Sequence, residues 1–526
     1  MKRFLLSGGL LVDGTGGAAR RMDVLVGDGV IEDVLASGTF LGDSAEVVDC
    51  SGKVVAPGFI DRHAHSDLSA LAHPGADSKL AQGVTTEVNG QCGSSPFPVA
   101  SGNAAEILKD ASVWHVDVDW ADTAGYRKKL SDFGTSINRV PFVGHGTLRG
   151  VVASYEDRRL APEELDELER LADRAVDEGA RGISAGLIYP PGCFSDTPEM
   201  LRVAAVAARR GVPLALHIRG EGDRLLDAID EVILLGRETG ARILVAHLKT
   251  YGPRNWAKID ALLEKLDAAR RSGLDLTADR YPYLASNTGL SAVLPLWAQE
   301  GGDVAVVDRL RSRSLKARIL EEITRRHPNE EDYWERVVIT TVAQEGLSAI
   351  VGKSVAEVAA EWKTTPAEAS VRILSEDHNG TSAIYFMMNQ ENLVRILQAP
   401  YVAVASDAAA LPLDAALVEG RPHPRAFGTF PRVLARHVRE KKELMLEEAV
   451  RKMTLLPAQS LGIADRGRIA AGLAADVVVF DPETVLDRAA FNAPVAAPAG
   501  IELVMVNGEI AWRNGAVAAG RPGRVL

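Results

Sequence analysis

The sequence predicts an α/β fold: a (β/α)8 TIM-like barrel with a small β-sandwich domain built from both termini and an inserted helical segment. Between residue 57 and about residue 463, short apolar strands alternate with amphipathic helices, which is typical of parallel βα units. Both ends of the chain instead carry short alternating apolar runs separated by glycines, which indicates antiparallel β-structure. At 526 residues the chain is long enough for a large barrel with an appended domain.

The two β-rich ends define the predicted second domain. Residues 1–56 and residues 464–526 both contain short apolar runs of the kind that form strands, for example at 475–481 and 501–509. The last of these runs ends in Asn507-Gly508, a dipeptide that favours a tight hairpin turn. We expect the two segments to pair into one domain that closes around the middle of the chain.

Periodicity places the strands and helices of the predicted barrel, residues 57–463. Apolar residues recur at helical spacing in 162–171, and a predicted strand follows at 182–187. About residues 287–380 interrupt the rhythm with charge-rich helices at 316–326 and 355–362, so we interpret them as an insertion. The alternation otherwise continues through helices at 203–210, 225–236 and 259–270 and strands at 212–216, 242–246, 274–278 and 401–405.

Composition narrows the class of partner. A formal net charge of -12 argues against nucleic acid or an anionic membrane surface, and favours a small-molecule substrate. The chain lacks the roughly 18 uninterrupted apolar residues that a membrane-spanning helix needs. With three cysteines, a disulfide framework is not expected and a reducing cytoplasm is the predicted location. The oligomeric state stays open, a homo-oligomer included.

Two histidines separated by one residue follow the apolar segment 54–60. Residues two apart in a strand point to the same side, so His63 and His65 can present their imidazoles to one metal ion. For this pattern alone, a pair of ordinary loop histidines would be at least as common. Two further predicted strands end in His217 and His247, and the active site of a barrel lies at such C-terminal strand ends. Together the four histidines predict a metal site.

These histidines lie in a series of motifs that resembles the amidohydrolase superfamily, specifically its D-aminoacylase (N-acyl-D-amino-acid deacylase) branch, over nearly the whole chain. A His-x-His pair is weak evidence by itself, whereas the full series in this order is specific. The matching stretches are PGFIDRHAHSD (57–67), GVTTEVNGQCGSSPFP (83–98), VGHGTLR (143–149), GISAGLIYPPG (182–192), LHIRGEG (216–222), VAHLKT (245–250), DRYPY (279–283), ASDAAALP (405–412), PHPRAFGTFPRVL (422–434) and AADVVVFDPETV (474–485).

The resemblance implies one tightly bound zinc ion, held by Cys92, His217 and His247. A thiolate and two imidazoles form a three-ligand set that leaves one position open for water. A small thiol is more often simply part of a protein core. The polar, glycine-flanked sequence NGQCG at 89–93 argues against that interpretation of Cys92.

The resemblance also implies a second, weaker metal position, lined by His63 and His65 with Cys92 and Asp407 nearby. Most two-metal amidohydrolases bridge their ions with a carboxylated lysine after the fourth strand. The corresponding stretch at 182–189 contains no lysine, which fits the branch in which cysteine replaces it. The same departure weakens the rival interpretation as a cyclic amidase.

Asp407, directly after the strand 401–405, is the carboxylate expected to transfer protons. It can accept a proton from the attacking water and return it to the leaving amine. A helix cap or a structural ion pair is the less interesting alternative for this residue.

The resemblance assigns the α-carboxylate of the substrate to Arg425, Lys249 and Tyr281. A guanidinium suits this role because it can bind a carboxylate through two parallel hydrogen bonds. The chain departs from the family pattern in a long segment, 408–424, between the expected acid and Arg425. Three further residues are expected around the substrate: Asn287, which stands where the family has a serine, Met388, for which ordinary core packing is the alternative, and His145, as a hydrogen-bond donor.

The predicted function is zinc-dependent hydrolysis of the linear amide of N-acyl-D-amino acids to a carboxylate and a free D-amino acid. The preference for the D enantiomer follows from the resemblance alone. The alternative is an amidohydrolase that acts on a cyclic amide or on another N-acylated amine, such as a natural-product intermediate. A non-catalytic scaffold is disfavoured because the chain keeps every expected ligand.

Overall fold

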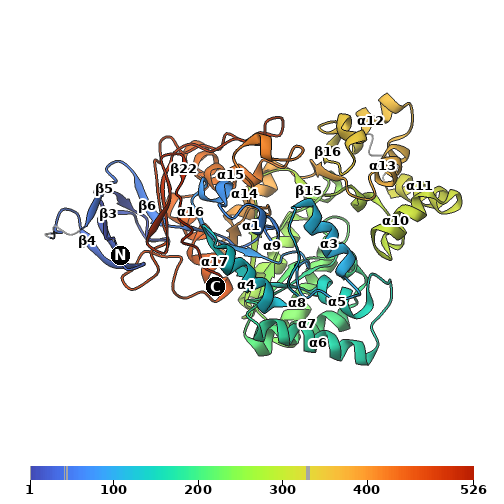
Figure 1. Cartoon of the computed structure of the whole chain (residues 1–526), viewed down its shortest axis with the longest axis horizontal. Helices are drawn as coiled ribbons and strands as arrows, with labels where there is room; N and C mark the ends of the chain where they lie inside the picture. Colours follow the sequence, from blue (N-terminus) through green and yellow to red (C-terminus); the bar gives the residue numbers. More distant parts are fainter. Residues whose placement is uncertain (1, 41, 43–44, 327–331) are drawn as a thin grey trace.

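The computed structural model describes residues 2–40, 42, 45–326 and 332–526. Strands from both ends of the chain form one ten-stranded sheet, in the order β22-β21-β20-β19-β6-β2-β3-β1-β5 with β4 paired to β3 (Figure 1, left). The two ends meet where β6 pairs antiparallel with β19. The strands are β1 (Phe4–Ser7), β2 (Leu10–Leu11), β3 (Arg20–Gly27), β4 (Val30–Ala36), β5 (Glu46–Asp49), β6 (Val54–Pro57), β19 (Val477–Phe480), β20 (Ile501–Val506), β21 (Glu509–Arg513) and β22 (Ala516–Val517).

Outside the predicted insertion, the strands in the middle of the chain run parallel. They form a three-stranded sheet, β7-β8-β9, and a six-stranded sheet, β10-β11-β12-β13-β14-β18. The first sheet comprises β7 (Phe59–Asp61), β8 (Val84–Asn89) and β9 (Asn138–Pro141), and the second β10 (Val143–Gly144), β11 (Ile183–Gly186), β12 (Leu214–His217), β13 (Ile243–Val245), β14 (Leu276–Arg280) and β18 (Val402–Val404). The last five of these strands coincide, within two residues at each end, with strands that the sequence predicts.

The two parallel sheets approach each other at both edges. Only Phe142 separates β9 from β10, and its amide donates a hydrogen bond to Asn89 O at 3.0 Å. At the opposite edge, just beyond β18 and β7, the amide of Asp407 donates to His63 O at 2.9 Å. Hydrogen bonds therefore lead from β18 back to β7 at the ends where the predicted site residues lie.

The two faces of the parallel strands carry different cores. One face contributes small and branched side chains that pack with α17 (Leu455–Leu461) and the residues after it. Side chains alternate along a strand, so residues next to those of the first cluster point to the opposite face. Phe59, for example, stacks there on Phe430 with 5.6 Å between the ring centroids. The members of the first cluster are Ile60, Val88, Val140, Phe142, Ala215, Leu244, Ala458, Leu461 and Ile463.

Amphipathic helices cover the parallel strands. The predicted helices at 162–171, 203–210, 225–236 and 259–270 lie inside α6, α7, α8 and α9. Helices α7 and α8 end at Gly211 (φ 65°) and Gly240 (φ 72°), in the left-handed conformation that glycine adopts without strain. These helices are α1 (Ser69–Ala72), α2 (Asp77–Leu80), α3 (Ala104–Val113), α4 (Thr123–Phe133), α5 (His145–Ala153), α6 (Pro162–Asp177), α7 (Thr197–Arg210), α8 (Leu225–Thr239), α9 (Ile259–Arg271), α14 (Gln390–Gln398), α15 (Arg425–Arg432) and α16 (Leu446–Met453).

The segment between β14 and β18 projects from the rest of the molecule with a core of its own (Figure 1, upper right). Its helices are α10 (Gly302–Arg311), α11 (Arg313–Arg326), α12 (Val355–Trp362) and α13 (Pro366–Glu376), two of which the sequence predicts. The segment also contains an antiparallel sheet, β15-β17-β16, which was not predicted from the sequence; its strands are β15 (Ser286–Gly289), β17 (Ser382–Tyr385) and β16 (Val337–Thr341). Within the described residues, no helix is long and apolar enough to cross a membrane.

Candidate metal centre and active site

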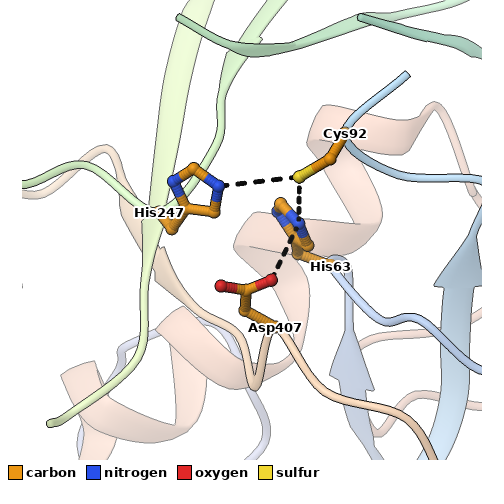
Figure 2. Close-up of side chains that lie close together, drawn as sticks. All are labelled: His63, Cys92, His247 and Asp407. Carbon is orange, nitrogen blue, oxygen red and sulfur yellow. Dashed lines mark hydrogen bonds and ion pairs between the residues drawn. The ribbon is translucent and has the colours of Figure 1, made fainter. Parts of the chain in front are cut away.

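The predicted metal ligands converge on the sulfur of Cys92. Sγ lies 3.4 Å from His63 Nε2, 3.6 Å from His217 Nδ1 and 3.6 Å from His247 Nε2. Figure 2 shows the rings of His63 and His247 directed at this sulfur, with Asp407 close to the same nitrogen of His63 that faces Cys92. Each of these residues ends or directly follows a parallel strand, so the strand ends bring together residues that are far apart in the sequence.

Small residues on neighbouring strands let the cysteine loop enter the site. After β8 the chain turns through Gly90 (φ 73°) and Cys92 (φ 53°), both in the left-handed region. A Cβ atom on Gly186 would lie 2.0 Å from Cys92 O, and one on Gly90 would lie 2.0 Å from Phe142 O. Any larger residue at Gly186, on β11, would therefore push the cysteine out of the cluster.

The spacing around Cys92 fits a tetrahedral zinc site. Sulfur and nitrogen ligands at about 2.3 and 2.05 Å from one tetrahedral ion lie about 3.5 Å from each other. The two distances within the predicted set, from Cys92 Sγ to His217 Nδ1 and to His247 Nε2, are both 3.6 Å and fall near this value. The donor types agree as well, because thiolate and imidazole are the ligands that zinc prefers.

For Cys92 and His217 the surroundings favour the protonation states that bind metal, whereas the pKa values of His63 and His247 are raised, despite their burial, by the negative charges of Cys92 and nearby carboxylates. Burial alone would raise the pKa of the Cys92 thiol, but the positive field of His63 and hydrogen bonds with His217 and His247 hold that pKa well below its usual range. Burial lowers the pKa of His217, which keeps this imidazole neutral. A thiolate and a neutral imidazole are the forms that ligate a metal ion.

A second group of donors lies on the His63 side of the cluster. Asp407 Oδ1 is 2.9 Å from His65 Nε2 and 3.4 Å from His63 Nε2. One ligand atom each from His63, Cys92, His247 and Asp407 all lie within 4.8 Å of one another, close enough to hold one ion. Another group within the same distance limit comprises His217, Glu221 and His247, so His247 belongs to both groups.

Glu221 is a site residue that the sequence analysis missed. Its Oε1 lies 3.0 Å from His247 Nδ1 and 3.7 Å from His217 Nε2, the ring nitrogens that face away from Cys92. A carboxylate on the outer nitrogen fixes the tautomer and orientation of a ligating histidine. Its position four residues after His217, in a motif already recognised, was the available signal.

Asp407 is held ionised in a strained backbone conformation. Its φ of 54° lies in the left-handed region, which costs free energy for a residue with a side chain. Burial alone would raise its pKa, but the charges of Arg425, His247 and His63 and a hydrogen bond with His65 hold the pKa well below its usual range. The carboxylate is therefore available as a base at neutral pH.

Arg425 pairs with Asp407. Its Nη1 lies 2.8 Å from Asp407 Oδ2, and its guanidinium stacks 4.8 Å from the ring centre of Tyr281. The side chain is only 5% exposed. From the sequence, this guanidinium is expected to bind the carboxylate of the substrate; in the structure, the carboxylate beside it is that of Asp407.

The other expected anchors, Lys249 and Tyr281, lie beside the cluster. Lys249 Nζ is 2.8 Å from His247 Nδ1 and forms a buried ion pair with Glu221. The Tyr281 hydroxyl is buried, and no described residue is its hydrogen-bond partner. Both residues line the cavity, but Lys249 already supports a candidate ligand.

Of the remaining expected residues, one lines the cavity and two do not. Asn287, on β15, lines it and accepts a long hydrogen bond from Thr340 at 3.4 Å. Among the described residues that line the cavity, Met388 and His145 are absent. Met388 packs in the core of the projecting segment, and His145 turns its Nε2 to the buried carboxylate of Glu199 at 2.7 Å.

The cluster opens into a cavity of about 1900 Å³. Its lining comes from the ends of the parallel strands, from β15 and β16 of the projecting segment, and from the stretch at 416–419 between Asp407 and Arg425. The cavity can hold a small organic substrate next to the cluster.

Comparison with known proteins identifies the family. A family model described as the amidohydrolase family matches residues 46–132 and 402–511. The chain is 38% identical to the N-acyl-D-glutamate deacylase of Alcaligenes xylosoxydans xylosoxydans, over 99% of this chain and 96% of that protein. The chain belongs to the amidohydrolase family, in its D-aminoacylase branch.

Two solved structures of this branch share the fold. The N-acyl-D-glutamate deacylase of Bordetella bronchiseptica, in complex with zinc and a phosphonate that mimics the tetrahedral intermediate, is 34% identical and matches with a TM-score of 0.84 over 100% of both chains. A D-aminoacylase with a binuclear metal centre, activated by one metal and attenuated by the second, is 33% identical with a TM-score of 0.84 over 99% of each chain. This amidohydrolase is thus an α/β metal-dependent hydrolase of amide bonds.

Proposed function

We propose that this amidohydrolase is a zinc-dependent N-acyl-D-amino-acid deacylase, which cleaves the linear amide of its substrate into a carboxylate and a free D-amino acid. One observation carries the proposal: the cluster around Cys92 shares a buried cleft with an ionised carboxylate, Asp407, and with the cation Arg425. Hydrolysis needs the metal and the base, and a substrate that carries a carboxylate needs the cation. The relatives that act on N-acyl-D-amino acids support this substrate class.

In this proposal Cys92, His217 and His247 hold one zinc tightly, and His63 and His65 line a second, weaker position. When bound, zinc polarises the amide carbonyl and lowers the pKa of water towards 7. Glu221 orients the imidazole of His247, and its carboxylate lies 3.7 Å from His217 Nε2. The binuclear centre of the D-aminoacylase relative, with its activating and attenuating metals, supports two unequal positions.

Asp407 moves the proton. Its Oδ2 faces Arg425 while Oδ1 faces the histidines, so the two carboxylate oxygens have different surroundings. We assign Oδ1 as the atom that accepts the proton of the attacking water and returns it to the leaving amine. Arg425 keeps Oδ2 in place during both transfers.

Arg425 and Tyr281 anchor the α-carboxylate of the substrate. A guanidinium has five N–H donors, so Arg425 can bind a second carboxylate while it holds Asp407. The Tyr281 hydroxyl is a further donor beside it, and Lys249 Nζ lies 6.0 Å from the centre of the Tyr281 ring. An anchor at this point places the scissile amide against the metal cluster.

The site also supports a domain assignment. We infer that β7, β8, β9 with β10, β11, β12, β13, β14 and β18 close into one barrel within residues 57–463, with residues 287–380 as its insertion. The hydrogen bonds at both edges of the parallel sheets support this closure. We assign residues 1–56 and 464–526 to the small β-sandwich domain.

A substrate panel tests the proposal. The purified zinc enzyme would be assayed with N-acetyl, N-formyl and N-succinyl derivatives of D- and L-amino acids that have acidic and apolar side chains. We expect kcat/KM for the preferred D substrate to exceed that for its L enantiomer by about 100-fold or more, since a misplaced amide loses the geometry of attack. Faster hydrolysis of cyclic amides or of amides without a carboxylate would refute it.

A further inference from the structure

Lys79 is a fully buried lysine in the short helix α2, outside the metal cluster. Its Nζ donates hydrogen bonds to Asp61 Oδ2 at 2.7 Å, to Ser406 Oγ at 2.9 Å and to Ala408 O at 2.9 Å. These partners use all three donors of the ammonium group. A buried ammonium group needs all of its hydrogen-bond partners, because leaving it unpaired costs much free energy. The contacts of Lys79 therefore fix the positions of the three acceptors.

Two of these acceptors flank Asp407 in the sequence. Ser406 precedes it and Ala408 follows it, so Lys79 holds the chain on both sides of the proposed base. Asp61 adds a further bond, because its Oδ1 accepts the amide of Ser406 at 2.9 Å. The strained backbone of Asp407, with φ of 54°, therefore lies between two anchored residues.

The same helix anchors the next part of the site. Ser78, beside Lys79, exchanges two hydrogen bonds with Leu411, at 3.1 and 3.0 Å. Gln82, just after the helix, donates to Ala426 O at 2.9 Å, next to Arg425. A single short element thus holds the segment that carries Asp407 and the start of the helix that carries Arg425.

We propose that Lys79 is a positioning residue for Asp407: its ion pair with Asp61 fixes the backbone at 406–408 so that Asp407 Oδ1 stays directed at the metal cluster. The kinetic part of this inference rests on the proposed function, since it takes Asp407 as the base. The anchoring of 406–408 is independent of any substrate.

Lys452 provides a matched control. It is also fully buried, and its Nζ donates to Ala399 O at 2.5 Å and to Val402 O at 3.1 Å, at the opposite end of β18 from Asp407. A lysine that only stabilises the fold should behave as Lys452 does. The comparison separates loss of stability from loss of positioning.

The experiment compares Lys79→Met and Lys452→Met in the zinc-loaded enzyme, at a temperature where both are folded. We expect kcat of Lys79→Met to fall by about 10- to 100-fold, because small displacements of a reacting group cost rate on this scale. KM and zinc content should change by less than about twofold. A fall in kcat without a change in KM or zinc content is not what a general loss of stability produces. Lys452→Met should keep kcat within about twofold of wild type, although both variants unfold at lower temperature.

Hydrogen exchange gives a readout that needs no substrate. Amides at 405–411 should exchange faster in Lys79→Met than in wild type or Lys452→Met, since their anchor is gone. Should Lys79→Met fail to fold, Asp61→Asn/Lys79→Met removes the ion pair between Asp61 and Lys79, while Glu87, 3.5 Å from Lys79 Nζ, keeps its ion pair with Arg139, and the double variant carries the same expectations. Unchanged exchange at 405–411, or equal losses of kcat in the Lys79 and Lys452 variants, would overturn the proposal. If wild type hydrolyses no N-acyl-D-amino acid, the proposed function fails while the exchange result still decides the anchoring.

Discussion

Arg425 Nη1 lies 2.8 Å from Asp407 Oδ2, so the proposed substrate anchor and the proposed base are ion-paired in the free enzyme. This contact couples two roles that the sequence analysis treats separately. The guanidinium lowers the pKa of the base, and a substrate carboxylate that binds to it shares the same positive charge. Substitution of Arg425 should therefore affect both binding and the pH dependence of turnover.

Arg425→Ala should raise KM and lower kcat/KM for N-acyl-D-amino acids by about 100-fold or more, because a charge-assisted contact that positions the amide is lost. Arg425→Lys should restore little, since a point charge does not reproduce the guanidinium fork. Steady-state kinetics on the α-amidated substrate provide the control. Wild type should hydrolyse that substrate poorly, and Arg425→Ala should then make almost no further difference; equal rates on acid and amide would show that no anchor exists.

The same variant should change the acid side of the pH profile. Turnover needs ionised Asp407, so it is present above the pKa of this carboxyl group and is lost as pH falls through it. Burial raises that pKa and Arg425 is the largest influence that lowers it. In Arg425→Ala the fall in kcat should begin at higher pH than in wild type. If kcat of wild type and of Arg425→Ala fell at the same acidic pH, the ion pair with Arg425 would not control the pKa of Asp407.

Asp407→Asn should keep its zinc and its fold but lose about 10³-fold or more in kcat, because an amide cannot accept the proton of water. Zinc content by elemental analysis and the melting temperature would be measured on the same samples. A variant with near-normal turnover would remove Asp407 from the mechanism. One that lost zinc as well would show that the carboxylate acts first as a ligand.

The three cysteines should differ in reactivity towards a thiol reagent. Burial raises the pKa of Cys50 and of Cys193 to about 12, so at pH 8 only about one in 10⁴ of these thiols is ionised. Cys92 has a pKa held below its usual range, so it should react in zinc-free enzyme and become protected when zinc is added. Mass spectrometry of alkylated peptides checks this, and labelling of Cys92 that is indifferent to zinc would argue against its role as a ligand.

The clustering of the predicted ligands could be anticipated from the sequence because each residue lies in a local pattern. His63, His217 and His247 end or follow apolar strands, and parallel strands place such residues at one end of the sheet. Cys92 is recognisable by its glycine-flanked loop, which the structure explains through the close approach of Gly186.

What could not be predicted depends on contacts between distant segments. His145 contacts the buried carboxylate of Glu199, which lies 54 residues away in the sequence. Its ring therefore points away from the cavity. The strand β15 has the polar sequence SNTG, in which only Thr288 favours a strand, and it is ordered by its partner β17. The pairing of Arg425 with Asp407 depends on the path of the chain at 408–424. The length of this segment does not predict that its end lies next to Asp407.

Glu221 should tune zinc affinity from outside the ligand set. Its Oε1 lies 3.0 Å from His247 Nδ1 and 3.7 Å from His217 Nε2, and it neutralises Lys249. Glu221→Gln should weaken zinc binding by about 10- to 100-fold, because the imidazoles lose their orienting carboxylate and Lys249 becomes an uncompensated positive charge beside the ion.

Competition with a chelator would measure this affinity, with Glu199→Gln as the matched control. Glu199 is another buried carboxylate that binds a histidine, His145 at 2.7 Å, but it lies outside the cluster. Both substitutions remove one buried negative charge and should lower the melting temperature. Only Glu221→Gln should weaken zinc binding, and a similar loss of affinity in Glu199→Gln would mean that the effect comes from general loss of stability rather than from the contact of Glu221 with His217 and His247.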